Sequence, residues 1–168
     1  VDLGNVVRFE DDAPTAALAL QGGVTVVVDE SLGQNGAPET EGGASGLGRV
    51  TVLGTTLFTS TAITGQDNEG ATTTVFSLSI VGAGATGLFS TDNQAITLFN
   101  NGGVIEGRYG ATVAFTLTID ATTGDVTLTQ LESLRHPTGG LATPGEFVSL
   151  AAGALNAVLT VTDGDLDV

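Results

Sequence analysis

Short runs in which apolar residues alternate with Thr or Ser constrain this chain more than any other feature. Thr112–Ile119 reads TVAFTLTI, and Thr74–Ile80 reads TVFSLSI. Alternation with a period of two buries one face of a strand and leaves the other in water. The further runs expected to form strands are Val24–Val28, Arg49–Leu53, Ala95–Phe99, Val126–Thr129 and Asn156–Thr162. The pattern predicts roughly eight to ten strands.

The segments between these runs predict tight turns. Residues 65–70, 100–103 and 120–125 are rich in Gly, Asn and Asp, which tolerate the positive φ that hairpin connections need. No stretch of ten or more residues shows a capped apolar pattern with the helical period. With 168 residues, we expect one domain spanning 1–168. The predicted fold is all-β, an antiparallel β-sandwich of the Ig-like or Greek-key type.

The charge balance excludes several classes of partner. Nineteen acidic and four basic residues give a net charge of −15, which repels nucleic acid and anionic lipid. The chain has no apolar run long enough to span a membrane, so we expect no membrane insertion. It has no Cys, which excludes disulfides and thiolate metal sites. The first residues do not form a signal peptide, so we expect either a cytosolic protein or an internal piece of a longer one.

Two acidic clusters near the ends of the chain are candidate metal sites. Alternate aspartates in a turn can direct several carboxylates at one point, and hard oxygen ligands at that density favour Ca²⁺. The alternative is a solvated acidic turn, or a charged strand end that prevents edge pairing. The candidate ligands are Glu10, Asp11 and Asp12 in the opening cluster and Asp163, Asp165 and Asp167 in the closing cluster.

Other acidic residues are weaker candidates. Asp29 and Glu30 follow an apolar run, and they either join such a site or end a strand. Asp120 and Asp125 flank a turn that Asp and Gly stabilise without a metal, and we favour this interpretation. The chain contains neither a complete EF-hand loop nor the glycine-rich nonapeptides of a calcium β-roll.

The sequence offers little for catalysis. It has one His, no Cys and no Gly-x-Ser-x-Gly motif, so a nucleophile would lack its usual base. We interpret Ser133 and His136 as structural rather than as members of a triad. Paired carboxylates of the glycosidase kind would lack a Trp platform for the sugar. We expect no enzymatic activity.

The order of motifs in the second half of the chain resembles the tandem repeat units of giant RTX adhesins that are exported by type I secretion. The opening segment 9–14, FEDDAP, is similar to the acidic junction that begins such a unit. The other motifs that carry the resemblance are AITLF at 95–99, VIEGR at 104–108, VAFTLTID at 113–120, TGDVTL at 123–128, LRHP at 134–137 and LTVTDGD at 159–165.

The resemblance implies a structural extender module of a bacterial surface adhesin. In this family, calcium ions at the junctions between β-sandwich modules stiffen a chain that projects a distal binding domain for adhesion and biofilm formation. The junctions here are 10–14 and 162–168, with the six acidic residues named above as ligands, although Leu166 stands where a Gly is common. The implied partners are neighbouring modules of the same polypeptide. We expect a monomeric module outside the cell, at the bacterial surface.

A ligand-binding module of the same adhesin is the alternative function. The Gly-rich stretch from Ser31 to Gly48 is expected to be a long loop, and long loops on rigid scaffolds often carry binding sites. Its ligand would be a surface glycan or a protein.

Overall fold

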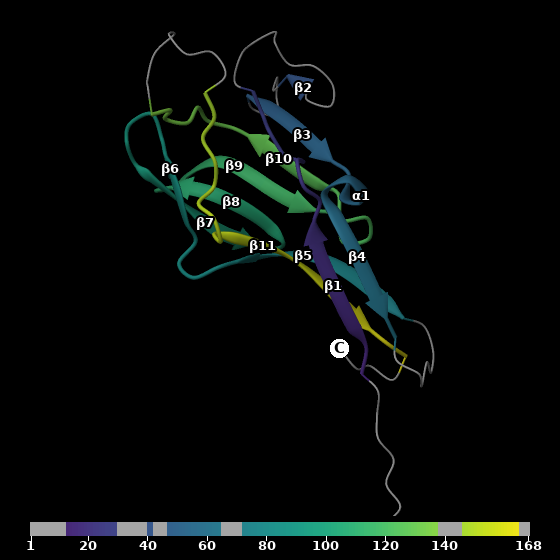
Figure 1. Ribbon diagram of the computed structural model, residues 1–168. Helices are drawn as coiled ribbons and strands as arrows, with labels where there is room; N and C mark the ends of the chain where they lie inside the picture. The colour runs from purple at the N-terminus through teal and green to yellow at the C-terminus, as the bar shows by residue number, and fades with distance from the viewer. Residues whose placement is uncertain (1–12, 30–39, 42–46, 65–71, 138–145, 165–168) are drawn as a thin grey trace, which may run out of the picture.

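The computed structural model describes residues 13–29, 40–41, 47–64, 72–137 and 146–164, and its regular structure is almost entirely β (Figure 1). Every strand pair is antiparallel. The one helix in the described ranges is α1 (Gly54–Leu57), and no helix there is long and apolar enough to cross a membrane. The strands are β1 (Thr15–Leu20), β2 (Thr40–Glu41), β3 (Gly48–Val52), β4 (Phe58–Ile63), β5 (Thr73–Ile80), β6 (Ala85–Phe89), β7 (Ala95–Asn101), β8 (Val104–Tyr109), β9 (Thr112–Ile119), β10 (Val126–Gln130) and β11 (Leu155–Thr162). The all-β, antiparallel prediction is confirmed.

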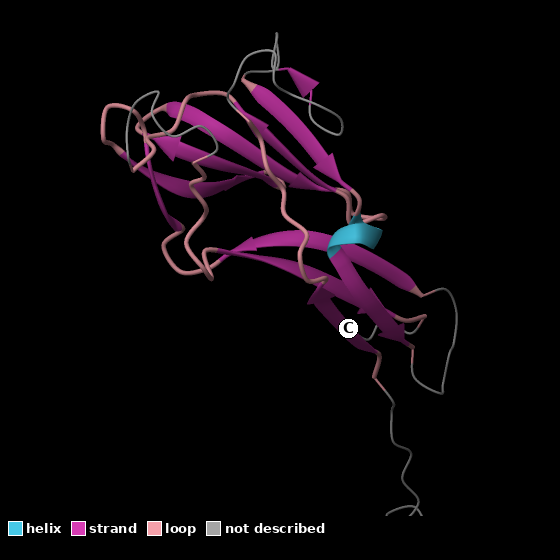
Figure 2. Ribbon diagram, turned by 45° about the horizontal axis from the view of Figure 1, so that its top comes forward, coloured by secondary structure: helices cyan, strands magenta, loops and turns pink. Residues whose placement is uncertain are grey.

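Seven strands form one large sheet in the order β2-β3-β10-β9-β8-β7-β6. Strands β6 to β10 follow one another through hairpins, and β3 joins at the free side of β10. The connection from β7 to β8 contains Gly102 and Gly103, both at positive φ, so this predicted turn is confirmed. The sheet curls rather than staying flat (Figure 2).

The remaining four strands form two pairs, β1 with β4 and β11 with β5. β1 also lies against β11. We call these four strands the small group. Figure 1 shows the small group beside the large sheet, with β1 beginning and β11 ending at the same end of the molecule.

One hydrophobic core joins the large sheet to the small group. Ile96, Leu98 and Ile105 pack in the same cluster as Leu57 and Phe58, which come from α1 and β4. The rings of Phe58 and Phe76 stack with centroids 6.3 Å apart, so β4 and β5 meet at this core.

A glycine in the middle of β8 is required by the same packing. A Cβ on Gly107 would lie 2.3 Å from the ring of Phe115, its cross-strand partner on β9. Only a residue without a side chain therefore lets the Phe115 ring lie across β8.

The prediction of a strand at Val24–Val28 was wrong. These residues form no regular secondary structure, and they pair with no strand in the described part of the chain. Val24 and Val26 are half-buried and pack against the core. The alternation therefore reflects burial of every second side chain by tertiary packing, without a hydrogen-bonded neighbour. Conversely, β1, β2, β4, β6 and β8 were not predicted as strands, and β2 lies within the stretch from Ser31 to Gly48 that was expected to be a loop.

Candidate functional site

Of the six predicted calcium ligands, one lies within the described residues. Asp163 directly follows β11, and it is 5% exposed. Burial of a carboxylate is costly unless it is compensated by partners, so this position is not a freely solvated turn. The other five predicted ligands, Glu10, Asp11, Asp12, Asp165 and Asp167, lie outside the described residues.

Asp163 lies at the same end of the fold as the start of β1. β1 begins at the end of the molecule where β11 stops (Figure 1), and Thr15 follows the opening acidic cluster in the sequence by three positions. Within the described ranges, no three His, Asp or Glu side chains gather as a metal site would require. The donor set of the two predicted clusters is all carboxylate oxygen, which is the chemistry that Ca²⁺ prefers.

Asp120 and Asp125 are used by the fold itself. Oδ1 of Asp120 accepts hydrogen bonds from the backbone N–H groups of Thr123 and Thr122, both at 2.8 Å. These two hydrogen bonds, first that from Thr123, hold the pKa of Asp120 below its usual value. Oδ1 of Asp125 accepts a hydrogen bond of 2.8 Å from the N–H of Gly54, which ties the turn to α1. The interpretation of this pair as turn residues is confirmed.

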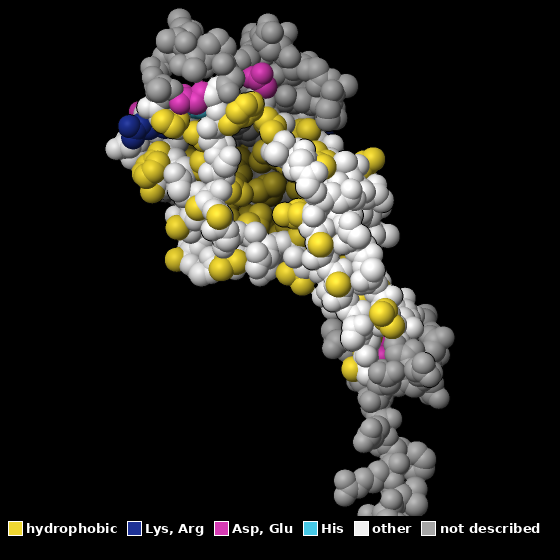
Figure 3. Space-filling view, in the orientation of Figure 1, with side chains coloured by type: hydrophobic (Ala, Val, Ile, Leu, Met, Phe, Trp, Pro, Cys, Tyr) yellow, Lys and Arg dark blue, Asp and Glu magenta, His cyan; other side chains and the backbone are white. Residues whose placement is uncertain are grey.

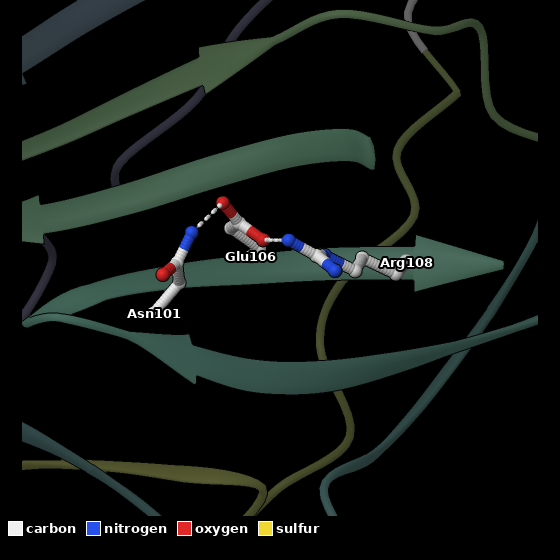
Figure 4. Close-up of polar contacts among 3 residues, drawn as sticks. All are labelled: Asn101, Glu106 and Arg108. Carbon is white, nitrogen blue, oxygen red and sulfur yellow. Dashed lines mark hydrogen bonds and ion pairs between the residues drawn. The ribbon is translucent and has the colours of Figure 1, made fainter. Parts of the chain in front are cut away.

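A polar cluster on β7 and β8 was not predicted as a site (Figure 4). The neighbouring Ile105 points into the core, so Glu106 lies on the opposite face of the sheet. Oε1 of Glu106 accepts a hydrogen bond of 3.0 Å from the side-chain amide of Asn101, and Oε2 pairs with Arg108. The guanidinium carbon of Arg108 lies 5.9 Å from the ring centroid of Phe99.

The electrostatics of this cluster indicate a structural role. Glu106 is 8% exposed, and the hydrogen bond from Asn101, with the ion pair to Arg108, lowers its pKa despite the opposing effect of burial. An ionised carboxylate with both oxygens engaged is a poor general acid or base. A sequence signal did exist, because residues two apart on a strand share a face and Glu106 and Arg108 carry opposite charges.

Ser133 and His136 lie in the segment that follows β10. This segment crosses the edge of β6, with a bridge from Leu134 to Ser90 and a hydrogen bond of 2.9 Å from the Arg135 N–H to the Phe89 carbonyl. Ser133 is exposed and His136 is half-buried. The segment therefore covers this edge of β6.

Comparison with known proteins gives one family. Residues 25–168 match the sequence model of a family described as a domain of unknown function, DUF5801. The chain belongs to the DUF5801 family. No curated protein and no solved structure matches it.

The DUF5801 match begins after β1, and every other strand falls inside it. β1 nevertheless contributes to the packing of this DUF5801 member. Its Leu18 and Leu20 help to line a hollow of about 320 Å³ between the small group and the large sheet. Figure 3 shows hydrophobic side chains on the walls of a hollow on the face in view. The remaining lining residues are Val26, Leu57, Phe58, Val126, Leu155, Asn156 and Ala157.

Proposed function

We propose that this DUF5801 member is a structural extender module of a bacterial surface adhesin of the RTX type, stiffened by calcium at its acidic junctions. The observation that carries the proposal is the buried carboxylate of Asp163 at the exit of β11, at the end of the molecule where β1 begins. The same proposal includes type I secretion, a place outside the cell at the bacterial surface, and neighbouring modules as partners. The module serves adhesion and biofilm formation by holding a distal binding domain away from the cell.

The charge distribution supports a metal at the junction. β1, β4, β5 and β11 contain no Lys, Arg, Asp or Glu. One acidic cluster precedes β1 in the sequence, and the other follows β11. No basic residue on these strands offsets the charge of either cluster. Bound Ca²⁺ would neutralise these carboxylates and favour the folded state, whereas low calcium would leave them repelling one another.

The finer architecture belongs to the same proposal. We take the small group and the large sheet as the two layers of an Ig-like, Greek-key sandwich within a single module. Support comes from the shared core, in which Phe58 and Phe76 of the small group pack with Leu98 and Leu117 of the large sheet. A core that includes residues of both parts is expected of one folding unit.

The positions of the start of β1 and the end of β11 determine how much length such a module would add to an array. Because β1 begins where β11 ends, the chain enters and leaves the described fold at one end. The length of an array would then depend on the angle held at each junction as well as on the size of each module. Carboxylates from both sides of a junction on one ion would fix that angle.

The test is thermal unfolding in excess chelator and in millimolar calcium. The variant carries Asp163→Asn, Asp165→Asn and Asp167→Asn, and Asp92→Asn at an exposed turn is the matched control. If free calcium exceeds Kd a hundredfold, binding stabilises the fold by about 2.7 kcal/mol, or about 5–10 °C in Tm. We expect this shift in the wild type and in the control, and a clearly smaller one in the triple variant. An equal shift in the triple variant, or none in the wild type, contradicts a site at the closing cluster.

A further inference from the structure

Strand β1 and residues 59–63 of β4 form a two-stranded ribbon, which we call the β1–β4 ribbon (Figure 1). β1 pairs with β4 alone, and β4 pairs with no second strand in the described part of the chain. β1 lies against β11, but no backbone hydrogen bond joins these two strands among the described residues. The ribbon is therefore held to the rest of the fold by its side chains and by its connections, and not by sheet pairing.

Few side chains of the β1–β4 ribbon are buried. Leu18 is the one residue of β1 that is not exposed, and residues 59–63 are all exposed. The large apolar side chains of Leu20 and Ile63 are 76% and 64% exposed. The ribbon also contains no charged residue, so its own side chains form no ion pair with the rest of the fold. Because burial of apolar surface is the main favourable contribution to folding, this attachment is weak.

The hollow of about 320 Å³ lies beside the ribbon, where further packing would be expected. Leu18 and Leu20 line it from the ribbon, and Leu155, Asn156 and Ala157 line it from β11. Atoms that face such a space have no partner on its other side and lose the dispersion contacts of a packed core. The hollow therefore weakens the contact between β1 and the beginning of β11.

The end of the β1–β4 ribbon next to α1 is firmly anchored. Phe58 is 8% exposed, and its ring stacks on that of Phe76. The N–H of Gln21 donates to the Leu57 carbonyl at 2.8 Å, and its side-chain amide donates to the Phe58 carbonyl at 3.1 Å. At the opposite end, where β1 begins and β4 ends, the strand residues are exposed. One anchored end and one exposed end are the requirements for a hinge.

The family comparison separates β1 from the rest of the fold in the same way. The match to the DUF5801 model, residues 25–168, includes β4, the large sheet and the β5–β11 pair, but not β1. The sequence pattern of the family therefore covers the core without the strand that pairs with β4. This is expected of a core whose packing does not depend on β1.

We propose that the β1–β4 ribbon is a hinged flap, which opens about Phe58 and uncovers the apolar hollow while the large sheet and the β5–β11 pair stay folded. Opening breaks the contacts of Leu18 and the hydrogen bonds within the ribbon, whereas unfolding of the large sheet breaks the whole core. Regions with few buried apolar contacts open at a lower free energy than the whole fold. The flap is a property of the chain by itself and rests neither on calcium nor on the proposed function.

The experiment is amide hydrogen exchange of the whole chain under native conditions. Ala19 lies opposite Thr59 in the register of β1 and β4. The hydrogen bond from Gln21 to Leu57 continues this register two residues further along, so Ala19 and Thr59 also exchange backbone hydrogen bonds. Their amides therefore report the opening of the ribbon.

The large sheet has a corresponding reporter pair and supplies the decisive variant. Thr118 and Thr127 lie opposite each other in β9 and β10, and the hydrogen bond from Asp120 to Asp125 makes them a hydrogen-bonded pair by the same alternation. Ile105→Ala removes a side chain that is 0% exposed in the core of this sheet. Because the open flap retains this core, Ile105→Ala should destabilise global unfolding without changing the opening of the flap.

In the wild type, we expect the amides of Ala19 and Thr59 to exchange at least about a hundredfold faster, relative to their intrinsic rates, than those of Thr118 and Thr127. Ile105→Ala should speed exchange of the large-sheet pair by about thirtyfold or more and leave the ribbon pair unchanged. Equal protection of the two pairs in the wild type, or equal acceleration of both by Ile105→Ala, overturns the proposal.

Leu18→Ala is the matched control in the ribbon. The contacts of Leu18 are lost both in the open flap and in the unfolded chain, so this variant should speed exchange of both reporter pairs by the same factor. If Ile105→Ala does not fold, low concentrations of urea replace it. Urea should speed exchange of the large-sheet pair steeply and that of the ribbon pair little, because flap opening exposes less surface. A parallel rise of both pairs with urea contradicts a separate flap.

Discussion

The large sheet and the small group are built from similar strand sequences but differ in burial and charge. In β8 and β9 every residue is buried or half-buried, and the sheet carries the ion pair of Glu106 and Arg108. In β1 and β4 all residues except Leu18 and Phe58 are exposed, and no charge is present. The large sheet gives each central strand two neighbours and a core, whereas β1 and β4 are anchored by few side chains.

This difference indicates a division of tasks. Stability should come mainly from the large sheet, because burial of apolar surface is the dominant favourable contribution to folding. The small group contributes an exposed edge at β4 and the end of the fold where β1 begins and β11 ends. Under the proposed function, contacts with neighbouring modules are expected at the part of the fold that contributes least to its own stability.

The test with the largest expected effect replaces one Ile by Ala in each of the two regions. Ile105 in β8 is 0% exposed, and Ile63 in β4 is 64% exposed. Ile105→Ala should lower the free energy of unfolding by about 2–5 kcal/mol, since it leaves a cavity in the core. Ile63→Ala should change it by less than about 0.5 kcal/mol. Urea unfolding followed by circular dichroism measures both. Equal losses would show that the small group is as tightly packed as the large sheet.

How far the sequence predicted the fold depended on this same difference. Alternation identified β5, β9 and β11 because their core-facing positions are large and apolar. β1 reads TAALAL and β4 reads FTSTAI, so Ala, Ser and Thr give little contrast between faces. Their exposure explains this, because strands with two wet faces place no demand on alternation. The run at Val24–Val28 was wrongly predicted to be a strand because its alternate residues are half-buried, although it pairs with no strand in the described part of the chain.

The candidate site was predictable in its chemistry and less so in its geometry. The spacing of Asp163, Asp165 and Asp167 indicates a calcium-type ligand set by residue type alone. The burial of Asp163 and the shared end of β1 and β11 are products of the strand order, which local sequence does not encode. The cluster around Glu106 needed the β7–β8 register, because Asn101 comes from the adjacent strand.

The dependence of stability on pH tests the polar cluster of Glu106, Asn101 and Arg108 in the large sheet. We expect a smaller change in the free energy of unfolding than for Ile105→Ala. The pKa of Glu106 is lower in the folded protein, first through the hydrogen bond from Asn101 and then through Arg108. A lowered folded pKa means that the ionised form stabilises the fold above the unfolded pKa of about 4.3, and that this stabilisation is lost as pH falls through the folded value.

The variant Glu106→Gln should therefore be less stable than the wild type at pH 7, and the gap should narrow as the solution is acidified. Urea unfolding at a series of pH values measures the gap. Glu132→Gln removes an exposed carboxylate and serves as the control, with a smaller loss at pH 7. A gap that stays constant with pH would show that Glu106 matters for its shape rather than for its charge.

The smallest expected effect concerns threonine pairs on exposed faces. In the large sheet, the Thr51 and Thr127 hydroxyls are 2.8 Å apart across β3 and β10, whereas Thr61 in β4 lies opposite Ala17. Thr51→Val should cost about 0.2–1 kcal/mol, because it removes a cross-strand hydrogen bond. Thr61→Val should be neutral, since no hydroxyl pair is lost. A double-mutant cycle with Thr127→Val isolates the pair by urea unfolding. A coupling energy of zero between Thr51 and Thr127 would mean that the exposed face of the large sheet adds no more stability than that of the small group. Any greater stability of the large sheet would then come from its core alone.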